Sequence, residues 1–350
     1  MVRLSREIVV YVAAEFGTPE LLRRLSDPYW FQAFGCVLGF DWHSSGVTTT
    51  VCGAMKEGLT DLGRELGFFV AGGKGATSRK TPHEIVATCE RLGRDAAPLV
   101  TASRLAAKVD SAAVQDGYQI YHHAFFFTAA GEWCVVQQGM NEETRFARRY
   151  HWLSANVVNF VEEPHAAVCC DARDETVNLV AAESADARAR SVELAAEKPD
   201  VTLDAIAHAP AARLESSGLS GLIMPARHPL LPELDVNSRH LERILLSTYE
   251  QPPEDFTALV GREGVGARTL RALALASELI YGTPVSLRDP ARFAFAHGGK
   301  DGTPFPVDRE TYDRTITILH NALNRASLDR SEKVDAFKRL ATFRHDAPGP

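Results

Sequence analysis

The spacing of apolar residues predicts helices over most of the chain and strands in its middle. Apolar side chains recur every three or four positions over residues 1–33, 241–249 and 270–281, which is the spacing of a helix with one buried face. Residues 118–127 and 133–138 are instead rich in aromatic and β-branched side chains, with a short turn between them. This pattern predicts a β-hairpin.

A glycine-rich turn lies between the two C-terminal helices. Gly264 and Gly266 flank a single valine, and Arg268 and Thr269 follow at the start of the next helix. Glycine allows a tight turn with positive φ, and the amides at a helix N-terminus attract phosphate oxygens. The stretch 261–270 therefore predicts a helix-hairpin-helix element in which these four residues bind a nucleic-acid backbone. A turn with a purely structural role is the alternative.

Changes in composition divide the chain into four predicted parts. Residues 1–183 form a mixed α/β domain that would carry the chemistry, and residues 184–234, rich in alanine and charge and then in proline, form a helical linker region. Residues 235–326 form an all-α helix-hairpin-helix domain, and residues 327–350 form a charged C-terminal tail that is helical as far as about residue 343 and frayed at its end. The predicted fold class is α+β, because a mixed α/β part with a β-hairpin precedes an all-α part.

The composition argues against several classes of protein. The net charge of −7 disfavours a protein that coats nucleic acid without discrimination, so any contact with phosphates must be local. The six cysteines include no Cys-x-x-Cys pair, which disfavours a disulfide framework and a structural zinc site. The chain has no apolar run of about 18 residues and does not open on a leader pattern. We therefore expect a cytoplasmic protein with no membrane partner.

Cations next to glycines or aromatic residues predict further contacts with phosphates. Cations for phosphates and aromatic faces for bases are the composition of a nucleic-acid groove. The candidates are Lys74, Arg79 and Lys80 around a Gly-Gly-Lys loop, Arg148 and Arg149 after the hairpin, and His297 and Lys300 in a second Gly-Gly-Lys loop. Solvated basic loops without a ligand are the alternative.

A polar cluster directly after an apolar segment is the main candidate for chemistry. Asp41 and His43 follow residues 34–40, which we expect to form a short buried strand or a tightly packed apolar segment. With Glu142 and His123 they would offer carboxylate and imidazole ligands to a divalent metal, Mg or Mn, which would activate water against a phosphodiester. The histidine before His123 would face the other side of its strand. The alternative is that these side chains complete a polar core.

Several runs of residues resemble one family. They are residues 35–46, which contain Asp41 and His43, the glycine-rich loop 71–75, residues 115–119 and residues 137–141. In these runs and over nearly its whole length, the chain resembles the archaeal and bacterial family known as domain of unknown function 763. The resemblance implies no activity. It does imply another His-Gly-Gly-Lys stretch upstream in family members, so we expect part of a site to lie outside this chain.

The C-terminal part resembles helix-hairpin-helix DNA-binding proteins, and among them the endonuclease III class of DNA glycosylases. In that class a Pro-Val-Asp sequence follows the hairpin and its aspartate is catalytic, which implies a catalytic role for Asp308 here. Two departures are an insertion at 284–303 and Arg268, which stands where the bifunctional members have a nucleophilic lysine. Arginine stays protonated and cannot be that nucleophile. The alternative for Asp308 is the cap of the following helix.

Three functions are compatible with these residues. The first is a nucleic-acid processing or repair enzyme, with DNA ahead of RNA, that hydrolyses a phosphodiester or N-glycosidic bond while the hairpin holds the backbone. The second is a non-catalytic nucleic-acid-binding or repair-scaffold protein. The third is an enzyme that acts on a phosphorylated small molecule through the two Gly-Gly-Lys loops. Metal-dependent cleavage that is lost in Asp41→Ala or His43→Ala without loss of binding would select the first.

Overall fold

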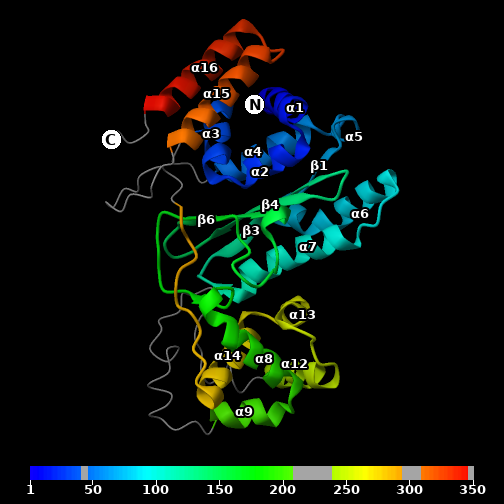
Figure 1. The fold of residues 1–350 in the computed structure, drawn as a ribbon, viewed down its shortest axis with the longest axis vertical. Helices are drawn as coiled ribbons and strands as arrows, with labels where there is room; N and C mark the ends of the chain where they lie inside the picture. The colour runs from blue at the N-terminus through cyan, green and yellow to red at the C-terminus, as the bar shows by residue number, and fades with distance from the viewer. Residues whose placement is uncertain (41–45, 208–238, 294–308, 346–350) are drawn as a thin grey trace.

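The computed structural model of the chain describes residues 1–40, 46–207, 239–293 and 309–345 (Figure 1). The predictions made for five residues lie outside these ranges: Asp41, His43, His297, Lys300 and Asp308. In the part of the chain that is described, no helix is long and apolar enough to cross a membrane.

An antiparallel sheet of five strands forms the middle layer. Its strand order is β1-β3-β4-β5-β6, from β1 (Phe68–Lys74) through β3 (Gln119–Thr128), β4 (Trp133–Met140) and β5 (Ala147–Leu153) to β6 (Ala167–Cys169). A small second sheet pairs β2 (Val114–Gln115) with β7 (Val177–Asn178). Strands β3 and β4 pair directly, with Phe127 opposite Trp133, which confirms the predicted hairpin.

Helices from both ends of the chain lie on one side of the sheet. They are α1 (Val2–Phe16), α2 (Thr18–Ser26), α3 (Pro28–Leu38) and α4 (Val47–Gly58), together with α15 (Arg309–Arg325) and α16 (Arg330–His345) (Figure 1). The short α5 (Gly63–Leu66) leads into β1. The apolar sides of these helices enclose Phe68, Phe126 and Val136 of the sheet in one core.

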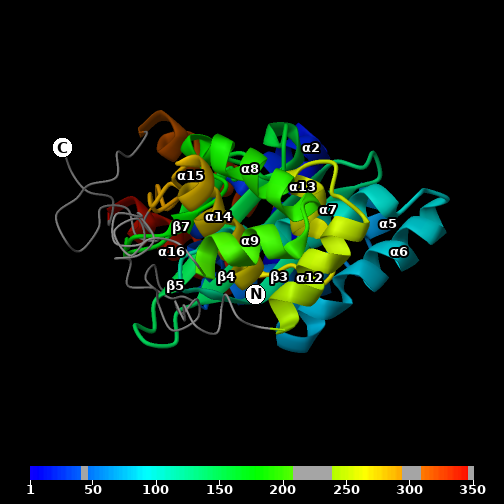
Figure 2. The ribbon, with the colours of Figure 1, turned by 90° about the horizontal axis from the view of Figure 1, so that it is seen from below.

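A second group of helices covers the other side of the sheet. Helices α6 (Thr81–Leu92) and α7 (Ala97–Lys108) pack against the strands, and α8 (Ala185–Ala196), α9 (Pro199–Ala207), α12 (Arg239–Glu250), α13 (Phe256–Gly261) and α14 (Ala267–Tyr281) lie beyond them (Figures 1 and 2). One core joins Phe125 and Trp152 of the sheet to Leu259 of α13 and Leu273 of α14.

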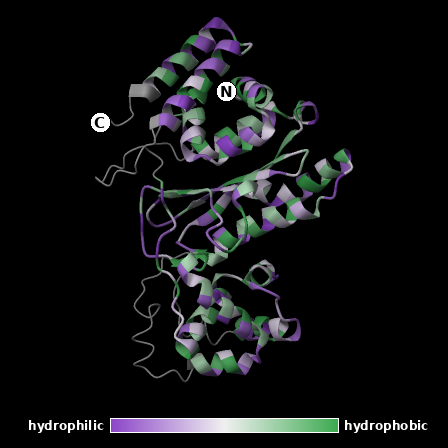
Figure 3. Ribbon diagram, viewed as in Figure 1, coloured by the Kyte–Doolittle hydropathy of each residue, from purple (hydrophilic) through white to green (hydrophobic). Residues whose placement is uncertain are grey.

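The α+β class and a helical C-terminal region are confirmed, and the described C-terminal helices are shared between two cores. Helices α12, α13 and α14 belong to the core below the sheet, whereas α15 and α16 pack with the N-terminal helices. Figure 3 shows hydrophobic and hydrophilic residues mixed along α15 and α16, and the buried ones include Leu319, Leu323 and Leu340. The charged tail is helical as predicted and forms α16, in which Ala336 and Leu340 are buried and Arg339 Nε donates to the Val37 carbonyl oxygen over 2.9 Å.

Residues 34–38 belong to helix α3, whereas the sequence was also compatible with a short buried strand. All of them are buried, and an apolar run that is buried on every side shows no helical period. Gly35 of α3 packs so closely on α4 that an added Cβ would meet Val47 Cγ1 at 2.4 Å. The glycine therefore lets two helices approach each other just before the segment that contains Asp41 and His43.

Candidate functional site

Helices α13 and α14 are joined by the glycine turn that the sequence singles out. Helix α13 ends at Gly261, and Gly266 is the N-cap of α14. Gly264 has φ +84°, which side chains rarely adopt, and an added Cβ would meet Ile244 Cδ1 at 3.3 Å. Gly266 is extended, and a Cβ built there would meet no atom within 4 Å. The shape of the turn thus requires glycine at position 264, whereas at position 266 glycine keeps the approach to the start of α14 open.

The turn lines a pocket together with a lysine from α7. The pocket has a volume of about 330 Å³, and its lining includes Gly264, Gly266, Arg268, Thr269 and Lys108. Burial lowers the pKa of the Lys108 ammonium group. The start of α14 adds the positive end of a helix dipole. The structure therefore gathers the four predicted hairpin residues at one pocket and adds a cation that the sequence alone did not indicate.

Polar contacts behind the pocket connect the start of α14 to β2. The Gln115 side-chain amide donates to the Ala267 carbonyl oxygen over 2.9 Å. Arg271 Nη1 in turn donates to Gln115 Oε1 over 2.7 Å. Gln115 and Arg271 are both buried. The first turn of α14 is therefore held in place by side-chain hydrogen bonds from the sheet region as well as by its apolar packing.

The first Gly-Gly-Lys sequence lies at the end of the edge strand β1. Gly72 has φ +90°, and an added Cβ would meet the His123 carbonyl oxygen at 2.1 Å. Glu84 Oε2 accepts hydrogen bonds from the Gly72 amide and from Lys56 Nζ, each over 2.7 Å. Gly72 therefore allows the close approach of β1 to β3, and side chains from α4 and α6 hold the end of the strand in place.

The cations of this loop face solvent. Lys74, Arg79 and Lys80 are exposed, and the last two lie on the 3₁₀ turn Gly75–Lys80. Lys74 Nζ lies 5.9 Å from the centre of the Tyr121 ring. Their exposure is compatible with the predicted phosphate contacts, which remain a prediction.

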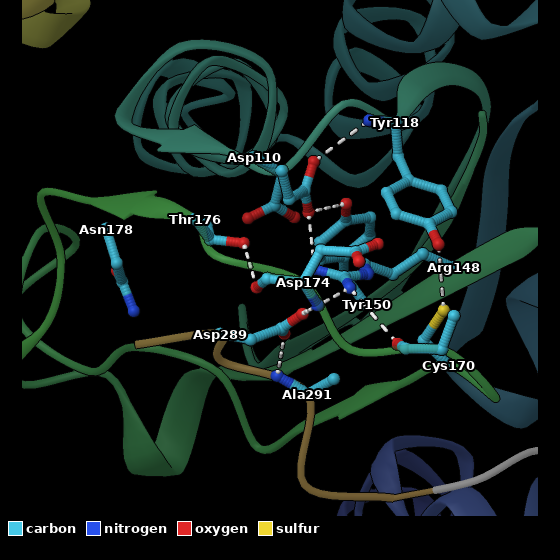
Figure 4. A network of polar contacts seen from close by, with 12 residues as sticks. Asp110, Tyr118, Arg148, Tyr150, Cys170, Asp174, Thr176, Asn178, Asp289 and Ala291 are labelled. Carbon is cyan, nitrogen blue, oxygen red and sulfur yellow. Dashed lines mark hydrogen bonds and ion pairs between the residues drawn. The ribbon is translucent and has the colours of Figure 1, made fainter. Parts of the chain in front are cut away.

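Arg148 of β5 lies inside the protein (Figure 4). Its Nη1 atom lies 3.0 Å from Asp116 Oδ2, and its Nη2 atom lies 2.7 Å from Asp289 Oδ2. Tyr150 donates its hydroxyl to Asp116 over 2.5 Å. Burial alone would lower the pKa of Arg148, but Asp116, Tyr150 and Asp289 outweigh burial and raise it well above its usual value. The predicted contact of Arg148 with a nucleic-acid backbone does not fit this burial, because two carboxylates already balance its charge.

Arg149 points to the opposite face of the sheet, as strand alternation requires. It is also buried, under α2, α3 and α4. Its Nε donates to His151 Nε2 over 2.8 Å, and its Nη1 lies 3.1 Å from Gln32 Oε1 and 3.5 Å from Thr48 Oγ1. Burial lowers the pKa of Arg149. The predicted phosphate contact of Arg149 therefore does not fit the structure either.

His123 of β3 is a hydrogen-bonded histidine of the sheet. Its Nε2 lies 2.9 Å from Ser103 Oγ, and its Nδ1 lies 2.8 Å from Gln137 Oε1. The Gln137 side-chain amide donates in turn to Asp110. Both ring nitrogens of His123 are thus occupied, and burial lowers the pKa of the ring. His123 could bind a metal only by giving up one of these hydrogen bonds, so the structure favours the alternative of a polar core for this residue.

The neighbouring His122 differs from His123, because within the described part of the chain neither of its ring nitrogens has a hydrogen-bond partner. It is fully buried on the face that the N-terminal helices cover. Burial, helped by His123 and Lys74, lowers the pKa of His122 to about 3. Glu142 lies exposed in the turn between β4 and β5. Over the described ranges, no group of three or more His, Cys, Asp or Glu side chains is placed to hold a metal ion.

A buried carboxylate paired with a histidine is the feature that sequence reasoning missed. His165 Nε2 lies 2.5 Å from Asp110 Oδ1. Asp110 lies on a π-helical turn, Val109–Ala113, at the end of α7, and His165 lies just before β6. Trp152 Nε1 donates to Asp110 Oδ2 over 3.0 Å. Figure 4 shows Asp110 close to the Asp116–Arg148 network. The two residues are separated by 55 positions, so no local pattern marks the pair.

Comparison with known proteins shows the family. The family model described as "Protein of unknown function (DUF763)" matches residues 1–307. Neither the comparison with curated proteins nor the comparison with solved structures gives a match. The match covers most of the 350 residues, in agreement with the resemblance of the glycine-rich and polar runs. The chain therefore belongs to the DUF763 family.

Proposed function

We propose that the protein binds nucleic acid, with DNA as the first ligand to test, through the backbone and without sequence preference. The observation that carries this proposal is the pocket of about 330 Å³ that Gly264, Gly266 and Thr269 line together with Lys108 and Arg268. A helix start, glycines that allow close approach and two cations suit a phosphate oxygen. The start of a helix and the glycine backbone contact phosphate oxygens and carry no base-specific side chain, so backbone contacts fit this turn better than sequence readout.

The charge distribution supports local rather than general binding. The whole chain has a net charge of −7, so a phosphate backbone is attracted only where cations gather. The pocket at the turn between α13 and α14, called the hairpin pocket from here on, is one such place. The exposed loop that contains Lys74, Arg79 and Lys80 is another. Arg148 and Arg149 are excluded from this role by their burial.

Hydrolysis is the reaction class that we attach to this binding, with the phosphodiester bond ahead of the N-glycosidic bond. The observation that favours an enzyme over a scaffold is the Asp110–His165 pair, because a histidine backed by a buried carboxylate is suited to proton transfer. Mg or Mn at Asp41 and His43, and a catalytic Asp308, stay predictions, since these residues lie outside the described ranges.

Binding of labelled nucleic acid tests the proposed function. Fluorescence anisotropy with a labelled duplex and a labelled single strand should show binding at about 50 mM salt that weakens steeply by about 200 mM. The slope of log K against log salt should be about −0.9 for each phosphate contact on a duplex. Absence of binding to both ligands at low salt would refute the proposal and leave an enzyme for phosphorylated small molecules as the remaining reading.

A further inference from the structure

A second pocket lies at the β6 edge of the sheet, apart from the hairpin. It has a volume of about 310 Å³, and its lining includes His165, Arg173, Arg288, Asp289, Arg292 and Asn178. The segment 286–293, which follows α14, forms one wall: the Cys170 amide donates to the Phe293 carbonyl oxygen, and the Asn178 amide donates to the Ser286 carbonyl oxygen, each over 2.9 Å. The pocket is therefore built from β6, β7 and a segment that is distant in sequence.

The hydrogen bonds of Asp110 determine which ring nitrogen of His165 carries the hydrogen. Asp110 is fully buried, and its Oδ2 accepts hydrogen bonds from Trp152 Nε1 and from the Gln137 side-chain amide. Its Oδ1 lies 2.5 Å from His165 Nε2. Because a carboxylate can only accept hydrogen bonds, His165 Nε2 carries the ring hydrogen and donates it to Asp110 Oδ1, so Nδ1 of the neutral ring keeps its lone pair. The carboxylate also stabilises the ring when Nδ1 gains a proton.

The ring of His165 is fixed in position at the pocket. Its edge packs on Trp152, with ring centres 4.7 Å apart, and its side chain is 7 % exposed. No described residue forms a hydrogen bond with Nδ1. This nitrogen is also not one of the fully buried polar atoms that lack a partner. Since His165 also lines the pocket, Nδ1 is the ring nitrogen that a ligand or water in the pocket can reach.

Three arginines and two carboxylates line the pocket. Arg173, Arg288 and Arg292 line it, against Glu163 and Asp289. The charge of Asp289 is already balanced by Arg148 at 2.7 Å. Glu163 lies 2.7 Å from Arg288 and 3.4 Å from Arg292, so one carboxylate is shared between two guanidinium groups. Arg288 also lies 3.3 Å from Glu183, and the side chains of Arg288 and Arg292 are 52 % and 62 % exposed, so their N–H groups can bind the anionic oxygens of a phosphate ester.

We propose that this pocket is a phosphodiester-hydrolysing site in which His165 is the general base and Arg292 and Arg288 bind the phosphate oxygens. His165 Nδ1 removes a proton from a water molecule, and the water oxygen bonds to phosphorus. The bond from phosphorus to the leaving oxygen breaks, and this oxygen takes the proton back from His165. The products are a phosphate monoester and an alcohol, and no oxidant or reductant is needed. Asp110 is a positioning residue, since it acts only through the imidazole.

This assignment is independent of the backbone grip at the hairpin. A small diester that carries no nucleic-acid backbone should be hydrolysed even by a protein whose hairpin pocket is blocked. Hydrolysis of a small probe therefore reports on His165, and duplex binding reports on the hairpin, so the two proposals fail separately.

The test is hydrolysis of bis(para-nitrophenyl) phosphate, with para-nitrophenyl phosphate as the monoester comparison, with and without added Mg or Mn. We expect the wild-type protein to release nitrophenol from the diester faster than from the monoester. His165→Gln should lower kcat by about 100-fold or more, the usual contribution of a general base. Arg292→Ala should raise KM by about 10-fold with kcat less affected, because it removes binding more than proton transfer. His83→Gln, on an exposed histidine of α6, should keep the wild-type rates.

Two results would overturn the assignment. One is diester hydrolysis no faster than in buffer under all of these conditions. The other is a folded His165→Gln variant that hydrolyses the diester at the wild-type rate. If that variant does not fold, ¹⁵N NMR of the wild-type histidine rings decides: inorganic phosphate should shift the Nδ1 signal of His165, and an unchanged signal would contradict the site.

Discussion

Arg148 Nη2 lies 2.7 Å from Asp289 Oδ2, and this ion pair joins the central sheet to the segment that follows α14. The two residues are 141 positions apart, and the pair is almost fully buried, with exposed side-chain fractions of 1 % and 7 %. Asp289 also accepts hydrogen bonds from the amides of Asp174 and Ala291. One carboxylate thus fixes a strand, a loop and the wall of the His165 pocket.

Removing this carboxylate should destabilise the fold strongly. Asp289→Ala leaves the Arg148 guanidinium buried with only one of its two carboxylates, so we expect the free energy of unfolding to fall by about 3 to 5 kcal/mol. Urea denaturation followed by circular dichroism measures this. Glu183→Ala is the matched control, because Glu183 pairs with Arg288 on the surface at 3.3 Å and should change stability by less than about 1 kcal/mol. Equal effects of the two substitutions would contradict the role of the buried pair.

The two glycines Gly72 and Gly75 should respond differently to alanine. In Gly72→Ala the new Cβ would meet the His123 carbonyl oxygen at 2.1 Å, which only a shift of the backbone can relieve. We expect a loss of about 3 kcal/mol or more from steric overlap and positive φ together. At Gly75, with φ +60°, nothing lies within 4 Å of an added Cβ, so only the backbone strain of about 1 kcal/mol should remain. Thermal melting of the two variants compares them, and a Gly72→Ala variant as stable as Gly75→Ala would contradict the close approach of β1 and β3.

His122 should make the protein less stable as the pH falls. Burial lowers its pKa from 6.5 to about 3, so the folded state binds fewer protons than the unfolded state between these values. The stability is fully present above about pH 6.5 and is lost as the pH falls toward 3, by about 1.4 kcal/mol per pH unit for this one group. His122→Leu should reduce the slope of unfolding free energy against pH by that amount. A slope that is the same in both proteins would show that His122 is protonated in the folded state.

The local patterns of the sequence predicted much of the fold. The hairpin of β3 and β4 and the helices α12 and α14 depend on neighbouring residues, and they form as the spacing of apolar positions indicates. The packing of α15 and α16 on the N-terminal helices was not predictable, because a contact such as Arg339 with Val37 leaves no mark on the local pattern. The same holds for α3, whose residues are buried on every side.

A candidate site could be predicted only where its residues lie in one continuous segment of the chain. The turn from Gly264 to Thr269 gathers at one pocket, because its shape is set by the glycines themselves. The burial of Arg148 and Arg149 could not be predicted from composition. Two adjacent arginines on a strand look the same in sequence whether they face solvent or are buried against polar partners. The Asp110–His165 pair is formed by tertiary packing alone and could not be inferred from spacing.

The most direct test of the central claim is duplex binding by the Gly266→Asp variant. Aspartate is a preferred N-cap residue, and Gly266 is extended with no atom within 4 Å of an added Cβ. The substitution should therefore leave the free energy of unfolding unchanged or raise it by about 0.5 kcal/mol. Its carboxylate would occupy the start of α14 and repel phosphate, so we predict at least about a 10-fold loss of affinity for a labelled duplex at low salt. Wild-type affinity in this folded variant would contradict the claim that the hairpin pocket holds the nucleic-acid backbone.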